Sequence, residues 1–360
     1  MHLARLSFVC VAVALGGCTV TRYVNPCYGA GLLIPTDATG DEIVAAADKC
    51  IADGGERKQG LIVRAAGRLR NEEYDRSLAD ADAAIALDPT YADAWYYRGY
   101  ANEEAGNREA AGRDFDKAID LGLAPGYAYR ARGRLKFIEN DFLGAYRDFD
   151  TILKANPDDQ EAYRLRGSAA AVLERFAQAE ADLTRAIELD GEDLRAYSAR
   201  GYVRYLTNRY PEAAADLKMA MRDKTEGLKT AFLYLAMRAA NDPEAWAEMQ
   251  RRAATLDPNS YPGVFPYLFL GQVSIDDMIG IAERTGKHSL PENQSEAFFY
   301  AGQQELMHGN IAAARTWFEK TLATGVIRFD EIRASRKELR AMGVPVPSPD
   351  PEAGKLSRAD

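Results

Sequence analysis

Arginine and aspartate recur in this chain at a fixed spacing that could support chemistry. The arginines are 34 residues apart: Arg64, Arg98, Arg132, Arg166 and Arg200. An aspartate follows each of them by 16 residues: Asp80, Asp114, Asp148, Asp182 and Asp216. Such arginines could bind an anionic ligand or pair with carboxylates. Because the two rows keep a constant offset, we predict one structural Arg–Asp pair in each repeat, which sets register and orientation more than it adds stability.

Other residues that could carry catalysis or bind a metal are few. His288 and His308 belong to no HExxH motif and have no neighbouring cysteine, so a zinc site is not expected. Residues 280–288 (GIAERTGKH) imitate a phosphate loop, but the glycine interval is one residue too long and His288 replaces the required Ser or Thr. We therefore expect no enzyme, metal or cofactor. The alternative is an enzyme, and that alternative predicts activity in the purified protein without any partner.

The elements that position the arginines follow the same period. Five blocks each carry two helical patterns joined by a short turn: 58–91, 92–125, 126–159, 160–193 and 194–227. The eighth position is small: Ala65, Gly99, Gly133, Gly167 and Gly201. The twenty-fourth is mostly large and apolar: Ala81, Phe115, Phe149, Leu183 and Leu217. The pattern resembles the tetratricopeptide repeat, which implies an all-α solenoid of antiparallel helix hairpins.

The sequence after the fifth block is less regular. Residues 228–294 read as a degenerate helical hairpin and a linker helix, and residues 295–328 as a further repeat. In that repeat Ala301 and Trp317 stand where the arginine and aspartate would be, so both charges are lost together. Residues 329–343 suit a capping helix. The proline-rich residues 344–360 are expected to form a disordered tail.

The N-terminal residues predict export and lipid attachment. An apolar run after Arg5 is too short to span a bilayer, so residues 1–17 read as a signal peptide. It ends in Leu-Gly-Gly-Cys, which resembles the lipobox of bacterial lipoproteins and implies acylation of Cys18, including by palmitate. The alternative is an ordinary secreted protein cleaved nearby. Because Thr19 is not the aspartate that retains lipoproteins in the inner membrane, we expect a lipid anchor in the outer membrane of a Gram-negative bacterium, with the protein facing the periplasm.

Two further cysteines lie in the segment 18–57. Cys27 and Cys50 form an even pair in an oxidising compartment, so a disulfide between them is expected. Two buried free thiols are the alternative.

A row of tyrosine and arginine is the candidate binding surface. Positions 2, 5, 9 and 12 of the first helix of this repeat line its concave groove. Here they include Tyr96, Tyr100, Tyr127, Arg130, Arg134, Phe137, Arg164, Arg195, Tyr202 and Tyr205. Tyrosine and arginine often dominate the energetics of protein interfaces. We therefore predict a groove for an extended acidic or carboxylate-bearing peptide. The alternative is that some of the tyrosines pack against the next repeat.

The net charge and the sequence of the C-terminal segments limit the classes of function to consider. A net charge of −9 argues against sequence-independent binding of nucleic acid. The segments FLYLAMR, YPGVFPYLFLGQVS and SEAFFYAGQQELMHGNIAAARTWFEKTLATGV resemble the NlpI-type outer-membrane lipoproteins. That resemblance implies an adaptor for protein partners in the periplasm, notably peptidoglycan hydrolases and a processing protease, and a homodimer. A structural component of an outer-membrane assembly or secretion apparatus is the alternative.

Overall fold

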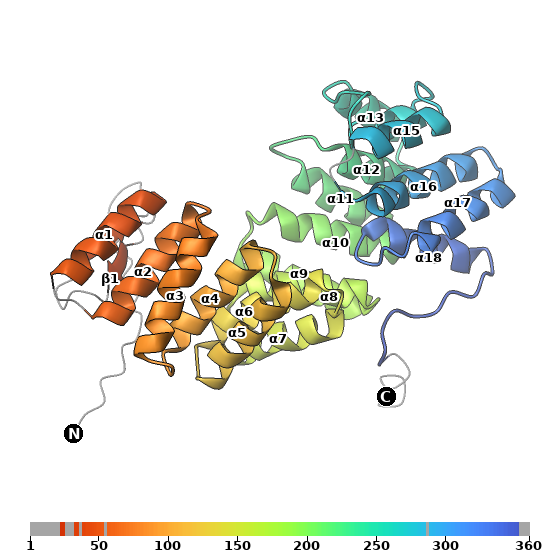
Figure 1. The fold of residues 1–360 in the computed structure, drawn as a ribbon. Helices are drawn as coiled ribbons and strands as arrows, with labels where there is room; N and C mark the ends of the chain where they lie inside the picture. The colour runs from red at the N-terminus through yellow and green to blue at the C-terminus, as the bar shows by residue number, and fades with distance from the viewer. Residues whose placement is uncertain (1–21, 26–31, 36–37, 54–55, 286–287, 353–360) are drawn as a thin grey trace. The chain divides into compact units, whose positions relative to one another are not determined.

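The structure is a computed structural model, and it describes residues 22–25, 32–35, 38–53, 56–285 and 288–352. Its helices form an α-solenoid of antiparallel helix pairs, and the described strands are confined to one short hairpin (Figure 1). The chain divides into two compact units, residues 1–135 and 136–360. The boundary falls inside a repeat rather than at a predicted domain limit. Each unit is described by itself.

The first unit begins with an antiparallel hairpin and a capped helix. Strands β1 (Arg22–Asn25) and β2 (Leu32–Pro35) pair with Arg22 opposite Pro35. Helix α1 (Gly40–Ala52) starts at a capping box, in which the Thr39 side chain accepts from the Glu42 backbone and the Glu42 side chain accepts from the Thr39 backbone. Such reciprocal bonds satisfy backbone donors that a helix start leaves unpaired. Helix α1 therefore has a defined first turn.

Regular helix hairpins follow in both units. In the first unit they are α2 (Arg57–Arg70), α3 (Tyr74–Leu87), α4 (Ala92–Glu104), α5 (Arg108–Asp120) and α6 (Pro125–Ile138), whose last residues belong to the second unit. In the second unit they are α7 (Phe142–Ala155), α8 (Gln160–Val172), α9 (Phe176–Leu189), α10 (Leu194–Leu206) and α11 (Tyr210–Ala220). Helices adjacent in the chain pack against each other within each unit.

The turn inside each hairpin repeats a backbone conformation. The residue after the first helix has a positive φ in all five blocks: Glu72, Gly106, Asn140, Glu174 and Asn208. This left-handed residue ends a helix by directing the chain back across it. Gly309 takes the same place in the repeat at 295–328. The period therefore extends to the backbone, even where the residue type is not glycine.

The glycine at the eighth position is where the paired helices meet. A Cβ on Gly99 would lie 2.6 Å from Phe115 Cε1, and one on Gly167 would lie 2.9 Å from Leu183 Cγ. Real Cβ atoms do not approach other atoms this closely. Glycine costs about 1 kcal/mol relative to alanine in a helix interior, so the close packing of the large partner must offset it.

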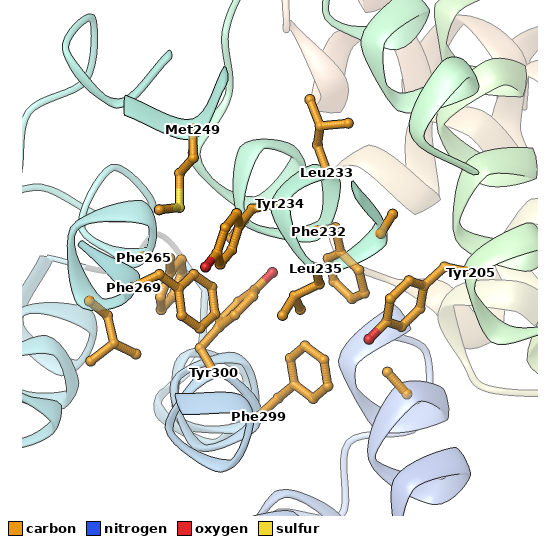
Figure 2. Close-up of a cluster of buried hydrophobic side chains, with 14 of the residues drawn as sticks. Tyr205, Phe232, Leu233, Tyr234, Leu235, Met249, Phe265, Phe269, Phe299 and Tyr300 are labelled. Carbon is orange, nitrogen blue, oxygen red and sulfur yellow. The ribbon is translucent and has the colours of Figure 1, made fainter. Parts of the chain in front are cut away.

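The second unit continues into an irregular helical section. Its helices are α12 (Gly227–Ala239), α13 (Ala245–Ala253), α14 (Phe265–Phe269), α15 (Ile275–Thr285), α16 (Leu290–Met307), α17 (Ile311–Ala323) and α18 (Asp330–Ala341). Figure 2 shows side chains of α10, α12, α14 and α16 pointing toward one another in its core. Phe232 stacks on Phe299 with ring centroids 5.4 Å apart, and Phe265 lies 4.6 Å from Tyr300. Aromatic packing therefore dominates this core.

The described part of the expected disordered tail, residues 344–352, packs against the second unit. Residues 344–352 are described; Val344 and Val346 pack against the aromatic core, and Asp350 is buried. Long-range contacts of this kind are not visible in local composition, which is why proline and polar residues alone suggested disorder. Residues 353–360 lie outside the described part.

Candidate protein-binding surface

The structure brings the arginine and aspartate rows together within the repeats. Arg98 donates to Asp114 from Nε (3.0 Å) and Nη2 (2.6 Å), and Arg166 donates to Asp182 from Nε (2.8 Å) and Nη2 (2.7 Å). The same two-bond geometry joins Arg64 to Asp80 and Arg200 to Asp216. The pair predicted for Arg132 and Asp148 falls across the boundary between the units and stays a prediction.

These arginines also reach a second acceptor that the sequence interpretation missed. Nη1 of each donates to a residue 16 positions upstream, on the second helix of the preceding hairpin. The acceptors are Asp48, Asp82, Asp116, Asp150 and Thr184. The signal was present as a third column in the 34-residue register. The first of these acceptors lies on α1, so α1 takes the place of a second helix before the first block.

The buried aspartates have a further donor each. Each of them accepts one more side-chain hydrogen bond. The donors are Arg68 to Asp80, Asn102 to Asp114, Lys136 to Asp148, Gln178 to Asp182 and Arg204 to Asp216. A buried carboxylate needs several charge-assisted bonds to offset lost hydration. Hydrogen bonding to Asp114 raises the pKa of Arg98, the expected direction for a paired cation. Because both partners are saturated with each other, this row is architecture and not an open anion site.

The more exposed part of the predicted surface lies on α4 and α6 in the first unit, where Tyr96 and Tyr100 are themselves partly buried against a core cluster that includes residues of the next repeat. The Tyr96 ring lies 5.1 Å from Tyr100 and 6.0 Å from Tyr127, both edge-to-face. Tyr127 is 48% exposed. Arg130 and Arg134 lie one and two turns further along α6, and Arg134 is exposed. Burial raises the pKa of Tyr96, so its phenol stays neutral at physiological pH. The structure thus presents an aromatic platform beside a cation.

An acidic side chain borders this platform. Burial raises the pKa of Glu103 on α4, and the nearby Arg134 opposes that shift. Arg134 is exposed, and its positive charge is close enough to Glu103 to oppose the rise of that pKa. An exposed arginine of this kind can pair with a partner's carboxylate.

Three residues of the predicted groove in the second unit need correction. Arg164 is 9% exposed, and its Nε lies 2.9 Å from Asp193 at the start of α10. Tyr205 is 4% exposed and lies 5.4 Å from Phe232, while Tyr202 lies 4.8 Å from the same ring. Helix α12 covers this face of α10, because the regular array ends there. Arg164 joins two repeats, and both tyrosines belong to the core.

The remaining groove residues in that unit differ in exposure. The Arg195 side chain is 76% exposed beside Asp193. Phe137 packs against Phe142, with ring centroids 5.0 Å apart. A single open arginine makes a weaker case for binding than the tyrosine–arginine surface of α4 and α6.

Other chemistry in the described residues does not assemble into a site. No group of three or more His, Cys, Asp or Glu side chains there is placed to hold a metal ion. His288 packs its ring near Tyr261 and Phe329. A cavity of about 200 Å³ is lined by residues that include Asn140, Ser289 and Arg328, but Arg328 pairs there with Glu292.

The structure describes only part of the region that carries the predicted N-terminal features. Cys50 on α1 is disulfide-bonded. Its expected partner Cys27, the signal sequence and the lipidation residue Cys18 lie outside the described residues. Within the described part of the chain, no helix is both long and apolar enough to cross a membrane.

Comparison with known proteins assigns the repeats. A tetratricopeptide-repeat model matches residues 63–128, 130–179 and 168–225. The hairpins in these ranges match the tetratricopeptide repeat. Such repeats generally mediate protein–protein interactions. Serine/threonine-protein phosphatase T of Trypanosoma brucei brucei is 40% identical over 58 residues, which are 16% of this chain. The match spans only 12% of the length of that protein, so the likeness is local.

Two solved structures share the fold. PilF of Pseudomonas aeruginosa has a TM-score of 0.52 and 13% identity, covering 63% of this chain and 98% of that one. PilW, a widely conserved type IV pilus biogenesis factor, has a TM-score of 0.50 and 18% identity, covering 56% and 94%. At these identities the tetratricopeptide-repeat fold is what the three chains have in common.

Proposed function

We propose that this tetratricopeptide-repeat protein is a non-catalytic adaptor that binds extended segments of other proteins. The observation that carries the proposal is the surface of Tyr96, Tyr100, Tyr127 and Arg134 on α4 and α6, which we call the tyrosine–arginine surface. Tyrosines supply large, rigid contact area at low entropic cost, and arginine binds carboxylates. An extended acidic peptide matches this chemistry.

The proposed cellular setting comes from the sequence. Acylation of Cys18 would hold the chain on the outer membrane, because several acyl chains together bind a bilayer firmly. The resemblance of the C-terminal segments to NlpI-type lipoproteins suggests peptidoglycan hydrolases or a processing protease as partners. A homodimer belongs to the same proposal.

Site-specific photo-crosslinking tests the surface directly. A photoreactive phenylalanine replaces Tyr127 in the lipidated protein, and a matched control carries it at Arg113 of α5, whose side chain is 65% exposed. Irradiated envelopes are expected to yield a defined adduct from position 127 and not from position 113, with the partner identified by mass spectrometry. The same adduct from both positions, or none from position 127, would reject the surface.

A second substitution separates specific from adventitious capture. Arg134→Ala in the position-127 background should lower the adduct yield about tenfold, as expected for an arginine that dominates binding. Arg164 is unsuitable for this purpose because its replacement would disturb the joint between two repeats. If the adduct contains only components of an outer-membrane assembly, the structural alternative replaces the adaptor.

A further inference from the structure

The chain returns to its own repeats after α18. Arg336 Nη1 donates to the Pro347 carbonyl at 2.6 Å, and Arg340 Nη2 donates to the Val346 carbonyl at 3.3 Å. Arg340 also pairs with Glu174, in the turn between α8 and α9, at 2.7 Å. These contacts fix the direction in which the following residues leave α18. Residues 348–352 then lie against α7 and the α8–α9 turn.

Two carboxylates of this segment are held by two arginines. Asp350 accepts from Arg175 Nε at 2.7 Å and Nη2 at 3.0 Å, and its side chain is 3% exposed. Glu352 accepts from Arg147 Nη2 at 2.7 Å and from Arg175 Nη2 at 3.2 Å. The fork geometry at Asp350 selects a planar carboxylate more strictly than a single charge contact would. The pKa of Asp350 is lowered by its bond to Arg175.

The carboxylates are presented by a short local turn. Ser348 Oγ accepts from the Asp350 backbone N–H at 3.2 Å, and Asp350 Oδ1 accepts from the Glu352 backbone N–H at 2.8 Å. Pro349 and Pro351 alternate with these residues and restrict the backbone. The ligand is therefore a stiff segment with carboxylates separated by one residue. Its local bonds could be reproduced by any chain of the same pattern.

The receptor is built from two consecutive repeats. Arg175 occupies the sixteenth position of its block, where the other blocks carry Glu73, Asn107, Asp141 and Arg209. Its guanidinium lies 5.3 Å from the ring centroid of Tyr146 on α7. The neighbouring Arg147 keeps a 64% exposed side chain. Two cations beside an aromatic ring form a surface of opposite sign to the acidic segment, at the edge of the repeats.

We propose that Tyr146, Arg147 and Arg175 form a binding site for acidic segments of other proteins in which two carboxylates are separated by one residue. The chain's own Asp350 and Glu352 occupy this site until such a segment displaces them. The site differs from the tyrosine–arginine surface, and the proposal does not depend on the function proposed above. It gives the protein a second, gated contact with a partner.

The polar contacts that a displacing segment must replace are ion pairs. The polar contacts of residues 348–352 with α7 and the α8–α9 turn are the ion pairs of Asp350 and Glu352, whereas the apolar contacts of Val344 and Val346 hold the segment before them. The Glu352–Arg147 pair lies near the surface, where ion pairs are weak and are screened by salt, whereas the buried fork of Asp350 and Arg175 is the stronger contact that a competing carboxylate must replace. A short tether raises the effective concentration of the internal ligand to about the millimolar range. An external segment must therefore bind tightly enough, at its own concentration, to displace the tethered residues 348–352.

Matched truncations test the gate. A chain ending at Pro347 lacks both carboxylates, whereas a chain ending at Glu352 keeps them and lacks only residues 353–360. Binding of two labelled peptides is measured by fluorescence anisotropy: residues 345–352 of this chain, and an Asp-Pro-Glu sequence between glycine–serine flanks. The chain ending at Pro347 should bind both peptides about tenfold more tightly than the chain ending at Glu352, because the tethered competitor is absent.

Substitutions locate the site. In the chain ending at Pro347, Arg175→Ala should weaken peptide binding about tenfold and Arg147→Ala about threefold, in keeping with three bonds against one. Arg147 is exposed, so its variant is expected to keep the thermal midpoint and remains informative if Arg175→Ala destabilises the turn. Peptides with Asn and Gln in place of Asp and Glu should not bind.

Two results would overturn the proposal. Equal affinity of the two truncated chains would show that the tail does not occlude the site. Binding of the chain's own peptide without binding of the glycine–serine peptide would show an intramolecular clasp that does not accept other proteins. Neither result would affect the crosslinking at Tyr127, so the two proposals fail separately.

Discussion

The fourth repeat (160–193) and the C-terminal repeat (295–328) form the same helix hairpin, but the side chains that join the two helices of the hairpin differ. In the fourth repeat Gly167 meets Leu183, and the ion pair of Arg166 and Asp182 lies beside them. In the C-terminal repeat Gly302 meets Phe318. The close glycine contact is common to both, so it is the requirement of the hairpin, and the ion pair is one of two ways to complete it.

The C-terminal repeat completes its joint with aromatic rings. Trp317, at the position of the aspartate, lies 5.5 Å from Phe298, and Lys320 Nζ lies 4.0 Å from the Trp317 ring centroid. A ring pair contributes without the desolvation cost of a buried ion pair. The regular repeats instead repeat one charged contact along the array, which fixes register between neighbours. We infer that the Arg–Asp pairs specify how neighbouring repeats stack. In the last repeat, apolar packing is sufficient to hold the two helices together.

Breaking one ion pair should have the largest effect. Asp182→Ala leaves Arg166 without its buried partner and is expected to lower the free energy of unfolding by about 3–5 kcal/mol. The double variant Arg166→Met/Asp182→Leu removes both charges and should lose less, about 1–2 kcal/mol. Urea denaturation followed by circular dichroism measures both. Equal losses in the two variants would mean that the charges act independently and that the comparison with the C-terminal repeat is misplaced.

Filling the glycine contact should have a smaller effect that both regions share. Gly167→Ala and Gly302→Ala each place a Cβ within 3 Å of a packed side chain and should cost about 1–3 kcal/mol. Gly112 on α5 is the control, because a Cβ there meets only Leu135 Cδ2 at 3.7 Å. Gly112→Ala should be neutral or stabilise by about 0.5–1 kcal/mol through helix propensity. Thermal unfolding midpoints of the three variants distinguish these outcomes.

The aromatic core contains two buried carboxyl groups close to each other, an arrangement that the Arg–Asp pairs of the regular repeats do not have. Glu296 and Glu331 are 3% and 5% exposed, and the Tyr300 hydroxyl donates to Glu331 at 3.3 Å. Burial and the neighbouring acidic groups Glu331 and Asp330 raise the pKa of Glu296 to about 10. Burial, with the charge of Asp330, raises the pKa of Glu331 to about 7, against the opposing effects of a backbone hydrogen bond, the Tyr300 hydroxyl and the charge of Arg333. Glu296 therefore favours its neutral form at neutral pH, and Glu331 does so below about pH 7.

The smallest predicted effect is a pH dependence of this core. A carboxyl with a raised folded-state pKa carries no penalty below its unfolded pKa, near 4.5. The folded protein then loses stability as the pH rises from there toward the raised pKa values, since it binds more protons than the unfolded chain. Glu296→Gln removes one such group and should gain about 1 kcal/mol by pH 8, since the unpaired amide offsets part of the benefit. Thermal midpoints between pH 5 and 8 test this; a wild-type midpoint that is flat while the variant falls would contradict it.

Local and periodic features could be predicted from the sequence. The hairpins, the glycine contacts and the Arg–Asp pairs of the described repeats follow from residues that recur every 34 positions. The upstream acceptors were missed because the first of them, Asp48, lies before the first block, and because within the five blocks their column ends in Thr184 and Lys218 and so looks like an exposed face. The residues that repeat most strictly are those that touch their own hairpin.

Contacts that break the period could not be predicted in this way. Arg164 pairs with Asp193, the cap of α10, at a position of the period that holds Asp in only two of the five blocks. Tyr205 is covered by α12, an element outside the register. Asp350 reaches Arg175 across 175 positions of sequence. Each of these depends on where the array ends and on what folds back over it.

The central claim is that the periodic arginines hold the fold while exposed arginine and tyrosine bind partners. The direct test compares Arg98→Met with Arg134→Ala in the protein carrying the photoreactive group at position 127. Thermal midpoint and adduct yield are measured together, the latter well below the midpoint. Arg98→Met should lower the midpoint and keep the adduct, whereas Arg134→Ala should keep the midpoint and lose most of the adduct. The reverse pattern would contradict the account, since the periodic arginines would then be the binding residues.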